Sequence, residues 1–305
     1  MIFVLGSINM DIVARVPYVP KQGETMNADK FYVNQGGKGA NQAVAIAKMG
    51  GQVKMIGKVG SDAFGVELKQ TLLSYGVDIT NVGDSKVNSG LAMIIVYEND
   101  NRIILDAGAN YDVTEKDVDD GLKDAKEGDI LIMQLEVPLS IVEYASVKAK
   151  EKGMITILNP APAKELSDLT LANTDILAPN ESETEILSGV CPNGDVELAL
   201  AAKALYRKGV KKLLVTLGSR GSAVIEGQNI TYVPAKKVNA VDTTSAGDTF
   251  VGATALMLSK GKTLLESAQF ATYASAITVQ REGAAQSIPT LEEVQAFIDS
   301  EKSVN

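Results

Sequence analysis

The sequence predicts an α/β fold with a mainly parallel sheet, and two observations carry this prediction. Short apolar runs alternate with amphipathic helical patterns between residues 115 and 216, which is typical of parallel strands joined by right-handed crossovers. The chain has 305 residues, of which 45% are hydrophobic, so it can bury one large core or two smaller ones. No internal repeat or linker interrupts the pattern, and we expect a single domain over residues 1–305.

The elements follow one another at the spacing that this fold requires. Strands are expected at the apolar runs 2–5, 53–57, 129–134, 154–158, 175–178 and 212–216. Helices are expected in an alanine-rich segment that stops at Gly50-Gly51 and at residues 64–75, 115–126, 140–150, 196–208 and 264–279. Thr290-Leu291-Glu292-Glu293 is a capping box for the last helix, and the tail after Ser300 is expected to fray.

Other segments indicate β-structure outside this alternation. Residues 11–16 and 25–33 have an extended pattern, and a hairpin is expected at 91–106 around Asn99-Asp100-Asn101. These pieces could form a small β-sheet apart from the main layers. A second hairpin is expected at 222–233.

Composition excludes several classes of function. A net charge of −9 and a pI near 4.8 argue against nucleic acid as a partner, because duplex binding needs a basic surface. No run approaches the roughly 18 apolar residues of a membrane span. The single cysteine, Cys191, excludes an intramolecular disulfide and favours a cytoplasmic protein. The absence of histidine leaves carboxylates as the natural proton acceptors.

The stretch Asp242-Thr243-Thr244-Ser245-Ala246-Gly247-Asp248-Thr249-Phe250 is the strongest candidate for chemistry. Small residues precede a helix pattern in which Phe250, Ala253 and Met257 share one face. Free amides at a helix start attract anions, and Asp248 falls in the first turn. We interpret this as a phosphoryl-transfer site with Asp248 as base and the amides of Ala246 and Gly247 as anion hole. The alternative is that Asp248 only complements the helix dipole.

A glycine-rich loop at residues 34–42 is a second candidate. Its glycines let the backbone approach a ligand, and Lys38 and Asn41 can donate hydrogen bonds. The spacing matches neither a Walker A loop nor a dinucleotide fingerprint. A flexible turn that caps a helix is the alternative.

Polar residues also follow most of the expected strands. Because the carboxyl ends of parallel strands share one edge of a sheet, we expect these groups to converge there. Each of them taken alone could be a turn or cap residue, and Arg220 could contact a phosphate or be a solvated surface charge. The residues concerned are Asn9, Asp11, Glu136, Asn159, Asn180, Glu183, the turn 216–221, Asp242 and Asp248.

Two of these motifs together resemble the paired signatures of the ribokinase-like (phosphofructokinase-B type) sugar kinases: Gly36-Gly37-Lys38-Gly39-Ala40-Asn41 and Asp242-Thr243-Thr244-Ser245-Ala246-Gly247-Asp248. Further segments resemble the family in the same order, so that the resemblance runs from Ile2 to the final helix. It implies a three-layer α/β/α core with a small β-sheet lid, formed by about residues 11–34 and 90–107. In this family the lid also forms the clasp of a homodimer.

The resemblance further implies ATP-dependent phosphorylation of ribose at O5, with Asp248 as general base and the Ala246 and Gly247 amides as anion hole. The sugar would lie against Asn9, Asp11, Gly37, Lys38, Asn41, Glu136 and Asp248. ATP would lie along Asn180, Thr216, Gly218, Ser219, Gly221, Gly247 and Thr272, and Glu183 would lie near the water shell of Mg²⁺.

Members of the family are also activated by K⁺ beside the anion hole. The positions that match this site are Asp242, Thr244, Thr278, Arg281, Gly283 and Ser287. For Asp242 the alternative is that it only braces the loop. Ser245 stands where many members have glycine or alanine, and Thr272 stands where an adenine-side His or Asn is frequent.

Two other functions stay open at this point. A related kinase could act on fructose, deoxyribose, 2-keto-3-deoxygluconate or a nucleoside, because lid and pocket residues decide the substrate. A non-catalytic sugar sensor could use the same fold, although such a protein could dispense with Asp248. An NAD-linked oxidoreductase is disfavoured, because no dinucleotide fingerprint follows the first strand.

Overall fold

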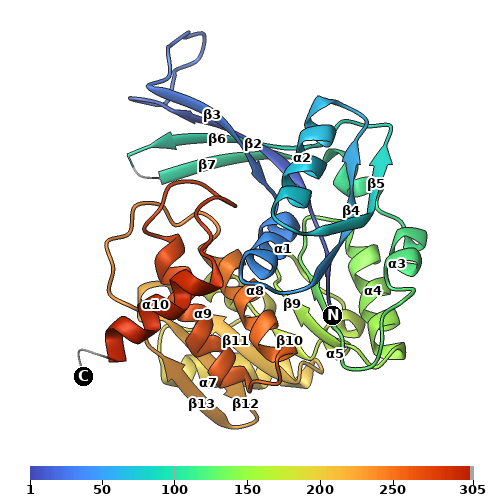
Figure 1. Ribbon diagram of the computed structural model, residues 1–305. Coiled ribbons are helices and arrows are strands. Elements are labelled where there is room, and N and C mark those ends of the chain that lie inside the picture. Colours follow the sequence, from blue (N-terminus) through green and yellow to red (C-terminus); the bar gives the residue numbers. More distant parts are fainter. Residues whose placement is uncertain (99, 303–305) are drawn as a thin grey trace.

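Two β-sheets of unequal size organise the chain in the computed structural model, which describes residues 1–98 and 100–302. The larger sheet has nine strands in the order β13-β12-β11-β10-β9-β8-β1-β4-β5. The smaller sheet has four strands in the order β3-β2-β6-β7 and stands beside the helices at the top of Figure 1. The predicted mainly parallel sheet with a separate small sheet is therefore confirmed.

The strands of the larger sheet follow the predicted apolar runs closely. All neighbours pair in parallel except the β11–β12 and β12–β13 pairs, which are antiparallel. The strands are β1 (Ile2–Leu5), β4 (Val53–Gly60), β5 (Asp78–Ser85), β8 (Ile130–Met133), β9 (Ile155–Leu158), β10 (Ile176–Leu177), β11 (Lys212–Thr216), β12 (Ser222–Glu226) and β13 (Asn229–Val233).

Helices cover both faces of this sheet, because its apolar side chains point alternately to either side. One buried cluster joins Val4, Ile132 and Leu214 to α1 (Lys38–Lys48), α2 (Ala63–Ser74), α8 (Ala246–Ser259), α9 (Leu264–Thr278) and α10 (Leu291–Lys302). The opposite cluster joins Leu5, Met133 and Val215 to α3 (Glu115–Gly121), α4 (Leu139–Glu151), α5 (Asp168–Ala172), α6 (Glu181–Ser188) and α7 (Asp195–Arg207). The expected three-layer α/β/α core is thus present.

The smaller sheet brings together the two segments that the sequence set apart. It consists of β2 (Asn9–Arg15), β3 (Lys30–Gly36), β6 (Gly90–Tyr97) and β7 (Asp100–Asp106), with β2 and β6 parallel. Because side chains alternate along a strand, Asp11 and Val13 point to one face, and Met10 and Ile12 point to the other. In Figure 1 the sheet stands above the loop that precedes α8.

Local signals in the sequence account for several helix starts. Thr114, Asn180 and Thr263 form capping boxes with the residue three positions later. Thr290 and Glu293 exchange the predicted capping bonds at the start of α10. Gly261, with φ of 78°, follows α8 as the expected stop.

Some predictions about elements were wrong. Strand β5 was not predicted, because its polar residues give no apolar run at this outer position of the sheet. Helix α3 ends at Gly121, and α10 continues beyond Ser300 to Lys302. The predicted turn residue Asn99 and the tail 303–305 lie outside the described residues.

Over residues 1–98 and 100–302, none of the helices is long and apolar enough to cross a membrane.

Candidate active site

Asp248 lies in the first turn of α8 and is 8% exposed. Both of its carboxylate oxygens accept hydrogen bonds from α1: Asn41 Nδ2 lies 3.1 Å from Oδ2, and Gln42 Nε2 lies 3.0 Å from Oδ1. Gln42 also bonds Asn159 and Gln134, which directly follow β9 and β8. Asp248 therefore sits at the edge of the large sheet where the parallel strands end, as the sequence predicted.

The start of α8 differs in one respect from the prediction. Ser245 holds the left-handed conformation with φ of 60°, and the Ala246 amide donates to Thr243 O at 3.2 Å. Of the two predicted free amides, only that of Gly247 lacks a partner among the described residues. A Cβ added at Gly247 would meet no heavy atom within 4 Å, so this residue borders open space on its Cβ side. Of the two amides predicted for the anion hole, that of Gly247 is thus available to a ligand, whereas the Ala246 amide already closes the preceding turn.

The glycine-rich loop lies against the segment after β1. Gly37 has φ of 90°, and an added Cβ would lie 2.8 Å from Asn9 N and from Ser7 O, so the close approach requires glycine. The Lys38 amide lies 3.3 Å from Glu136 Oε2, and Ser7 Oγ also donates to that oxygen. The predicted residues Gly37, Lys38 and Glu136 are thus in contact.

The Lys38 side chain is surrounded by acids from four different segments. Burial lowers the pKa of its ammonium group, but the charges of the nearby carboxylates outweigh burial and raise that pKa above its ordinary value; these carboxylates belong to Asp248, Glu136, Glu183 and Asp11. The convergence of acids that the sequence predicted is therefore organised around one lysine.

Asp11 is the acid that the small sheet contributes to this cluster. Burial, with the charges of Glu136 and Asp248, raises the pKa of Asp11 to about 7. A Cβ added at Gly36 would lie 2.1 to 2.3 Å from the Asp11 carboxylate atoms, so glycine is required beside it. The preceding predicted residue, Asn9, is fixed by Asn110 Nδ2, which lies 2.6 Å from its Oδ1.

Asn41 places a buried hydrogen-bond acceptor in this cluster. Asn41 is 5% exposed, and its Oδ1 has no hydrogen-bond partner among the described residues, although its Nδ2 bonds Asp248. A buried unpaired acceptor costs free energy unless a ligand donates to it. Nearby, a pocket of about 340 Å³ separates the Asp11 face of the small sheet from Asp242, Thr243 and Thr244. This volume lies in the range of small-molecule sites.

The residues predicted for the nucleotide form a second group. Asn180 caps α6, and Glu183 accepts from the Asn180 amide at 2.8 Å and from its Nδ2 at 3.1 Å. Asn180 also forms a β-bridge with Thr216, which leads into the turn at Gly218, Ser219 and Gly221. Burial raises the pKa of Glu183, and the charge of Asp248 acts in the same direction.

Two predicted residues have local partners instead. Thr272 Oγ1 donates to Ala268 O within α9 at 2.9 Å, and within the described part of the chain no hydrogen bond joins it to another candidate residue. Arg220 pairs with Glu181 at 2.5 Å, which explains its position without a phosphate.

Asp242 stabilises the loop that is predicted to bind K⁺. Its Oδ1 accepts from Thr244 N at 2.9 Å and Oγ1 at 2.6 Å, and its Oδ2 accepts from Gly283 N at 3.0 Å. Asp242 thus braces the loop through these contacts. The other predicted positions pair nearby: Thr278 with Thr249, Arg281 with Glu293, and Ser287 with Ala284.

For a divalent metal ion the described residues offer no cluster of three or more acidic, histidine or cysteine side chains. Mg²⁺ at phosphoryl-transfer sites is commonly held by one or two carboxylates together with phosphates and water. Both Glu183 oxygens already accept from Asn180, so this carboxylate fits a contact through water better than direct ligation.

Sequence reasoning missed three residues that orient this site. Gln42 and Gln134 are fully buried and reach Asp248 as a chain, and Asn110 fixes Asn9. Gln42 lies within the glycine-rich motif, so its place in that motif is a local signal. Gln134 and Asn110 carry no such signal, because their partners are 92 and 101 residues distant.

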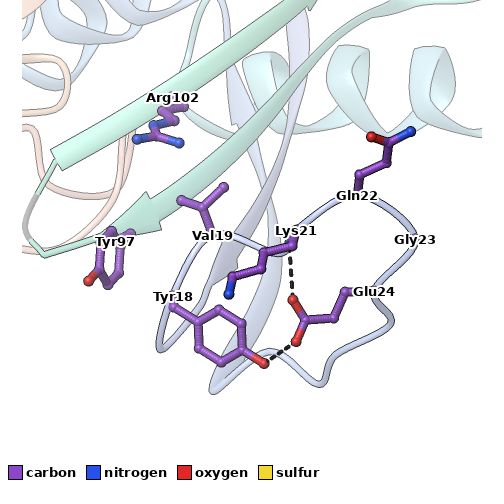
Figure 2. Close-up of a pocket in the computed structure, with 8 residues that line it drawn as sticks. All are labelled: Tyr18, Val19, Lys21, Gln22, Gly23, Glu24, Tyr97 and Arg102. Carbon is purple, nitrogen blue, oxygen red and sulfur yellow. Dashed lines mark hydrogen bonds between the residues drawn. The ribbon is translucent and has the colours of Figure 1, made fainter.

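A second hollow, of about 820 Å³, lies at the far end of the small sheet (Figure 2). It is lined by the loop 18–24 and by Tyr97 and Arg102. Its acid, Glu24, accepts from Tyr18 Oη at 2.6 Å and from Lys21 N at 2.9 Å. None of the residues predicted for catalysis, the sugar, the nucleotide or the cation lines it, so it is not part of the candidate active site.

Comparison with known proteins identifies the family. The pfkB family carbohydrate kinases match residues 1–291. A ribokinase of Haemophilus influenzae is 41% identical over 298 residues, 97% of each chain, and a deoxyribokinase of Salmonella typhimurium is 36% identical over 97% of this chain and 98% of its own. The structure of Arabidopsis thaliana ribokinase with ribose and ATP superimposes with a TM-score of 0.90 at 32% identity, covering 97% and 98% of the two chains. The chain therefore belongs to the pfkB family of carbohydrate kinases.

Proposed function

We propose that this carbohydrate kinase transfers the γ-phosphoryl group of ATP to O5 of ribose, giving ribose 5-phosphate and ADP. The observation that carries the proposal is the pair formed by Asp248 and Asn41: a buried carboxylate beside a buried acceptor that has no partner. A sugar with neighbouring hydroxyl groups can donate to both. Relatives that are named ribokinase, one of them in complex with ribose and ATP, support the choice of substrates.

In this proposal the residues around Lys38 hold the sugar. Asn41 Oδ1 accepts from a hydroxyl group, which satisfies the unpaired atom, and Asp11 and Glu136 accept from the other hydroxyls. Asn9, Gly37 and the Lys38 ammonium complete the site. The small sheet acts as a lid, because its Asp11 face closes the pocket from above.

The reaction then needs one proton acceptor and one site for negative charge. Asp248 takes the proton from the 5-hydroxyl as that oxygen forms a bond to the γ-phosphorus. The bond from the γ-phosphorus to the bridging oxygen breaks, and ADP leaves. The Gly247 amide donates to the phosphoryl oxygens, and the Ala246 amide joins it if the bond to Thr243 opens. One such donor typically contributes about 10²–10³ in turnover.

ATP is proposed to lie along Asn180 and the turn after β11. Gly218 has φ of 54° and Gly221 has φ of 98°, so this turn exposes backbone without side-chain bulk. Ser219 and Thr216 border it, and Thr272 lies on the adenine side in this proposal. Mg²⁺, when bound, neutralises charge on the phosphates, and Glu183 orders its water.

A K⁺ ion is proposed beside the anion hole, at Asp242, Thr244, Thr278, Arg281, Gly283 and Ser287. The Asp242 carboxylate supplies charge, and backbone carbonyl oxygens supply the neutral ligands that a hard cation prefers. Rates measured in K⁺ and in Na⁺ at fixed Mg-ATP test this part. Activation by K⁺ is expected, and equal rates would remove the cation site from the proposal.

The lid is also proposed to pair two chains as a homodimer. Its outer face exposes apolar side chains from three strands: Phe31 is 64% exposed, Met93 is 55% exposed and Ile104 is 64% exposed. A contiguous apolar face of this kind is typical of a protein–protein interface. A cytoplasmic location, which the single cysteine favours, belongs to the same proposal.

A second candidate substrate is deoxyribose, since a deoxyribokinase relative is nearly as similar as the ribokinases. A coupled ADP-release assay with Mg-ATP and K⁺ decides between them, with ribose, 2-deoxyribose, fructose, adenosine and 2-keto-3-deoxygluconate as substrates. Ribose is expected to have the highest kcat/KM. A higher value for another compound would overturn the choice of sugar, and no turnover with intact sugar binding would favour a sensor.

A further inference from the structure

A chain of four side-chain and backbone amides runs to the proposed catalytic base. Gln134 Nε2 lies 2.7 Å from Gln42 Oε1, and Gln42 Nε2 lies 3.0 Å from Asp248 Oδ1 and 3.1 Å from Asn159 Oδ1. Asn159 Nδ2 in turn lies 3.0 Å from Ala178 O. The chain connects residues after β8, β9 and β10 with α1 and α8. Gln42 is its centre and is fully buried.

The backbone carbonyl at one end of this chain fixes which atom donates and which accepts in every hydrogen bond of the chain. Ala178 O is a backbone carbonyl, which can only accept, so Asn159 must turn its NH₂ group toward it. Asn159 Oδ1 then faces Gln42, which must present its own NH₂ group. The amides therefore cannot flip independently, although each alone has two nearly equivalent orientations.

These fixed orientations determine which groups contact the Asp248 carboxylate. Because the orientation of Gln42 is fixed, an N–H group and never a carbonyl oxygen meets Asp248 Oδ1. Gln42 Oε1 is satisfied on the opposite side by Gln134, whose own position depends on the absence of a Cβ at Gly6. Asn41 Nδ2 holds the second carboxylate oxygen. The carboxylate is thus clamped at both oxygens.

We infer that Gln42 is a positioning residue that orients the Asp248 carboxylate toward the reacting hydroxyl and away from the neighbouring lysine. Three charged groups from other segments interact with this carboxylate and would otherwise determine where it points: Lys38, Asp11 and Glu183. Lys38 would attract it strongly, so a base without the amide clamp would turn toward that ammonium group. This inference rests on the proposed function.

The test is Gln42→Met, which keeps the size of the side chain and removes its donor and acceptor. We expect kcat to fall by about 10- to 100-fold, since a displacement of about 1 Å at a reacting group can cost about 100-fold. The KM for ribose should stay within about threefold, because Gln42 is not among the residues that face the sugar.

Thr254→Val is the matched control. Thr254 is 1% exposed in α8, the helix of Asp248, and its Oγ1 has no partner among the described residues. This variant also removes a buried polar atom, but it should leave kcat and KM unchanged. Asn159→Leu should give a smaller loss than Gln42→Met, because it frees the direction of the chain but keeps Gln42.

A crystal structure of free Gln42→Met examines the same inference without substrate. The Asp248 carboxylate should be rotated toward Lys38. An unmoved carboxylate, or a kcat within about twofold of the unmodified protein, would overturn the inference. If the unmodified protein has no turnover, the proposed function fails, and the position of Asp248 in the variant still decides the role of Gln42.

Discussion

The large and the small sheet differ in what covers their faces. Strands of the large sheet have helices on both sides, and Val4, Ile132 and Leu214 are fully buried. One face of the small sheet covers the pocket. On its other face Phe31 and Met93 are more than half exposed. A sheet that is packed on both faces holds its strand ends in fixed positions, whereas a half-covered sheet can move or pair with another surface.

The polar groups of the candidate site are also divided between the two sheets. Asp248, Gln42 and Glu136 lie on α8, on α1 and after β8, all attached to the large sheet. The small sheet contributes Asp11 to the same cluster. We therefore expect changes at the large sheet to affect turnover, and changes at the small sheet to affect sugar affinity and association of chains.

The largest effect is expected at the edge of the large sheet. Asp248→Asn should reduce kcat by about 10²–10⁴, the usual contribution of a general base, while sugar affinity stays largely intact. Steady-state kinetics and calorimetry measure the two quantities. Asp168→Asn, at an exposed first-turn acid of α5, is the control for a mere helix-dipole effect. Near-normal turnover in Asp248→Asn would remove the base assignment.

A charge on the outer face of the small sheet should separate two chains. Met93→Lys places an ammonium group among Phe31 and Ile104, which would be desolvated in an interface. Analytical ultracentrifugation should show a dimer for the unmodified protein and a monomer for the variant. Val196→Lys, at a 68% exposed position of α7, should remain dimeric. A dimeric Met93→Lys protein would contradict pairing through this face.

A methyl group beside Asp11 should weaken sugar binding. Gly36→Ala places a Cβ within 2.1 to 2.3 Å of the Asp11 carboxylate, which must then move. The loss of a hydrogen bond to a charged group corresponds to about a 10- to 100-fold increase in KM for the sugar. Gly83→Ala is the control, because its Cβ would meet nothing closer than 3.5 Å. An unchanged KM would place Asp11 outside the sugar site.

The smallest expected effect is on the pH dependence of the free energy of unfolding of the ligand-free protein. The pKa of Asp11 rises from an ordinary value of 3.8 to about 7 in the folded chain, so the folded state binds more protons than the unfolded state between these values. Its contribution to the free energy of unfolding therefore falls as pH rises through this window, by up to about 1.4 kcal/mol per pH unit. Asp11→Asn removes this contribution.

Denaturant unfolding of both proteins at about pH 5 and pH 7 measures the difference. Asp11→Asn should gain stability relative to the unmodified protein as pH rises. A constant difference between the two proteins would show that Asp11 titrates in its ordinary range.

The sequence was informative where the signal is local. The helix start at Asp248, the glycine-rich loop and the capping box at Thr290 are each formed by neighbouring residues, and the structure has them at the predicted positions. Strand β5 was missed because an outer strand with polar residues has no apolar run. The Ala246 amide was expected to be free, because a turn closed onto Thr243 depends on the conformation of Ser245.

Long-range polar contacts could not be predicted in the same way. The chain from Gln134 through Gln42 to Asp248 joins three segments, and its bonds span 92 and 206 residues. No local pattern encodes such partners, because the fold alone brings them together. Asp11 was predicted as a sugar ligand, but the rise in its pKa follows from burial beside Glu136 and Asp248.

The most direct measurement is the identity of the product. The purified protein is incubated with ribose, Mg-ATP and K⁺, and the products are followed by ³¹P and ¹³C nuclear magnetic resonance. The account predicts ADP and a phosphomonoester whose phosphorus couples to C5 of ribose, formed at a rate that Asp248→Asn lowers by orders of magnitude. A phosphate on another ribose oxygen, or ADP without any sugar phosphate, would contradict it.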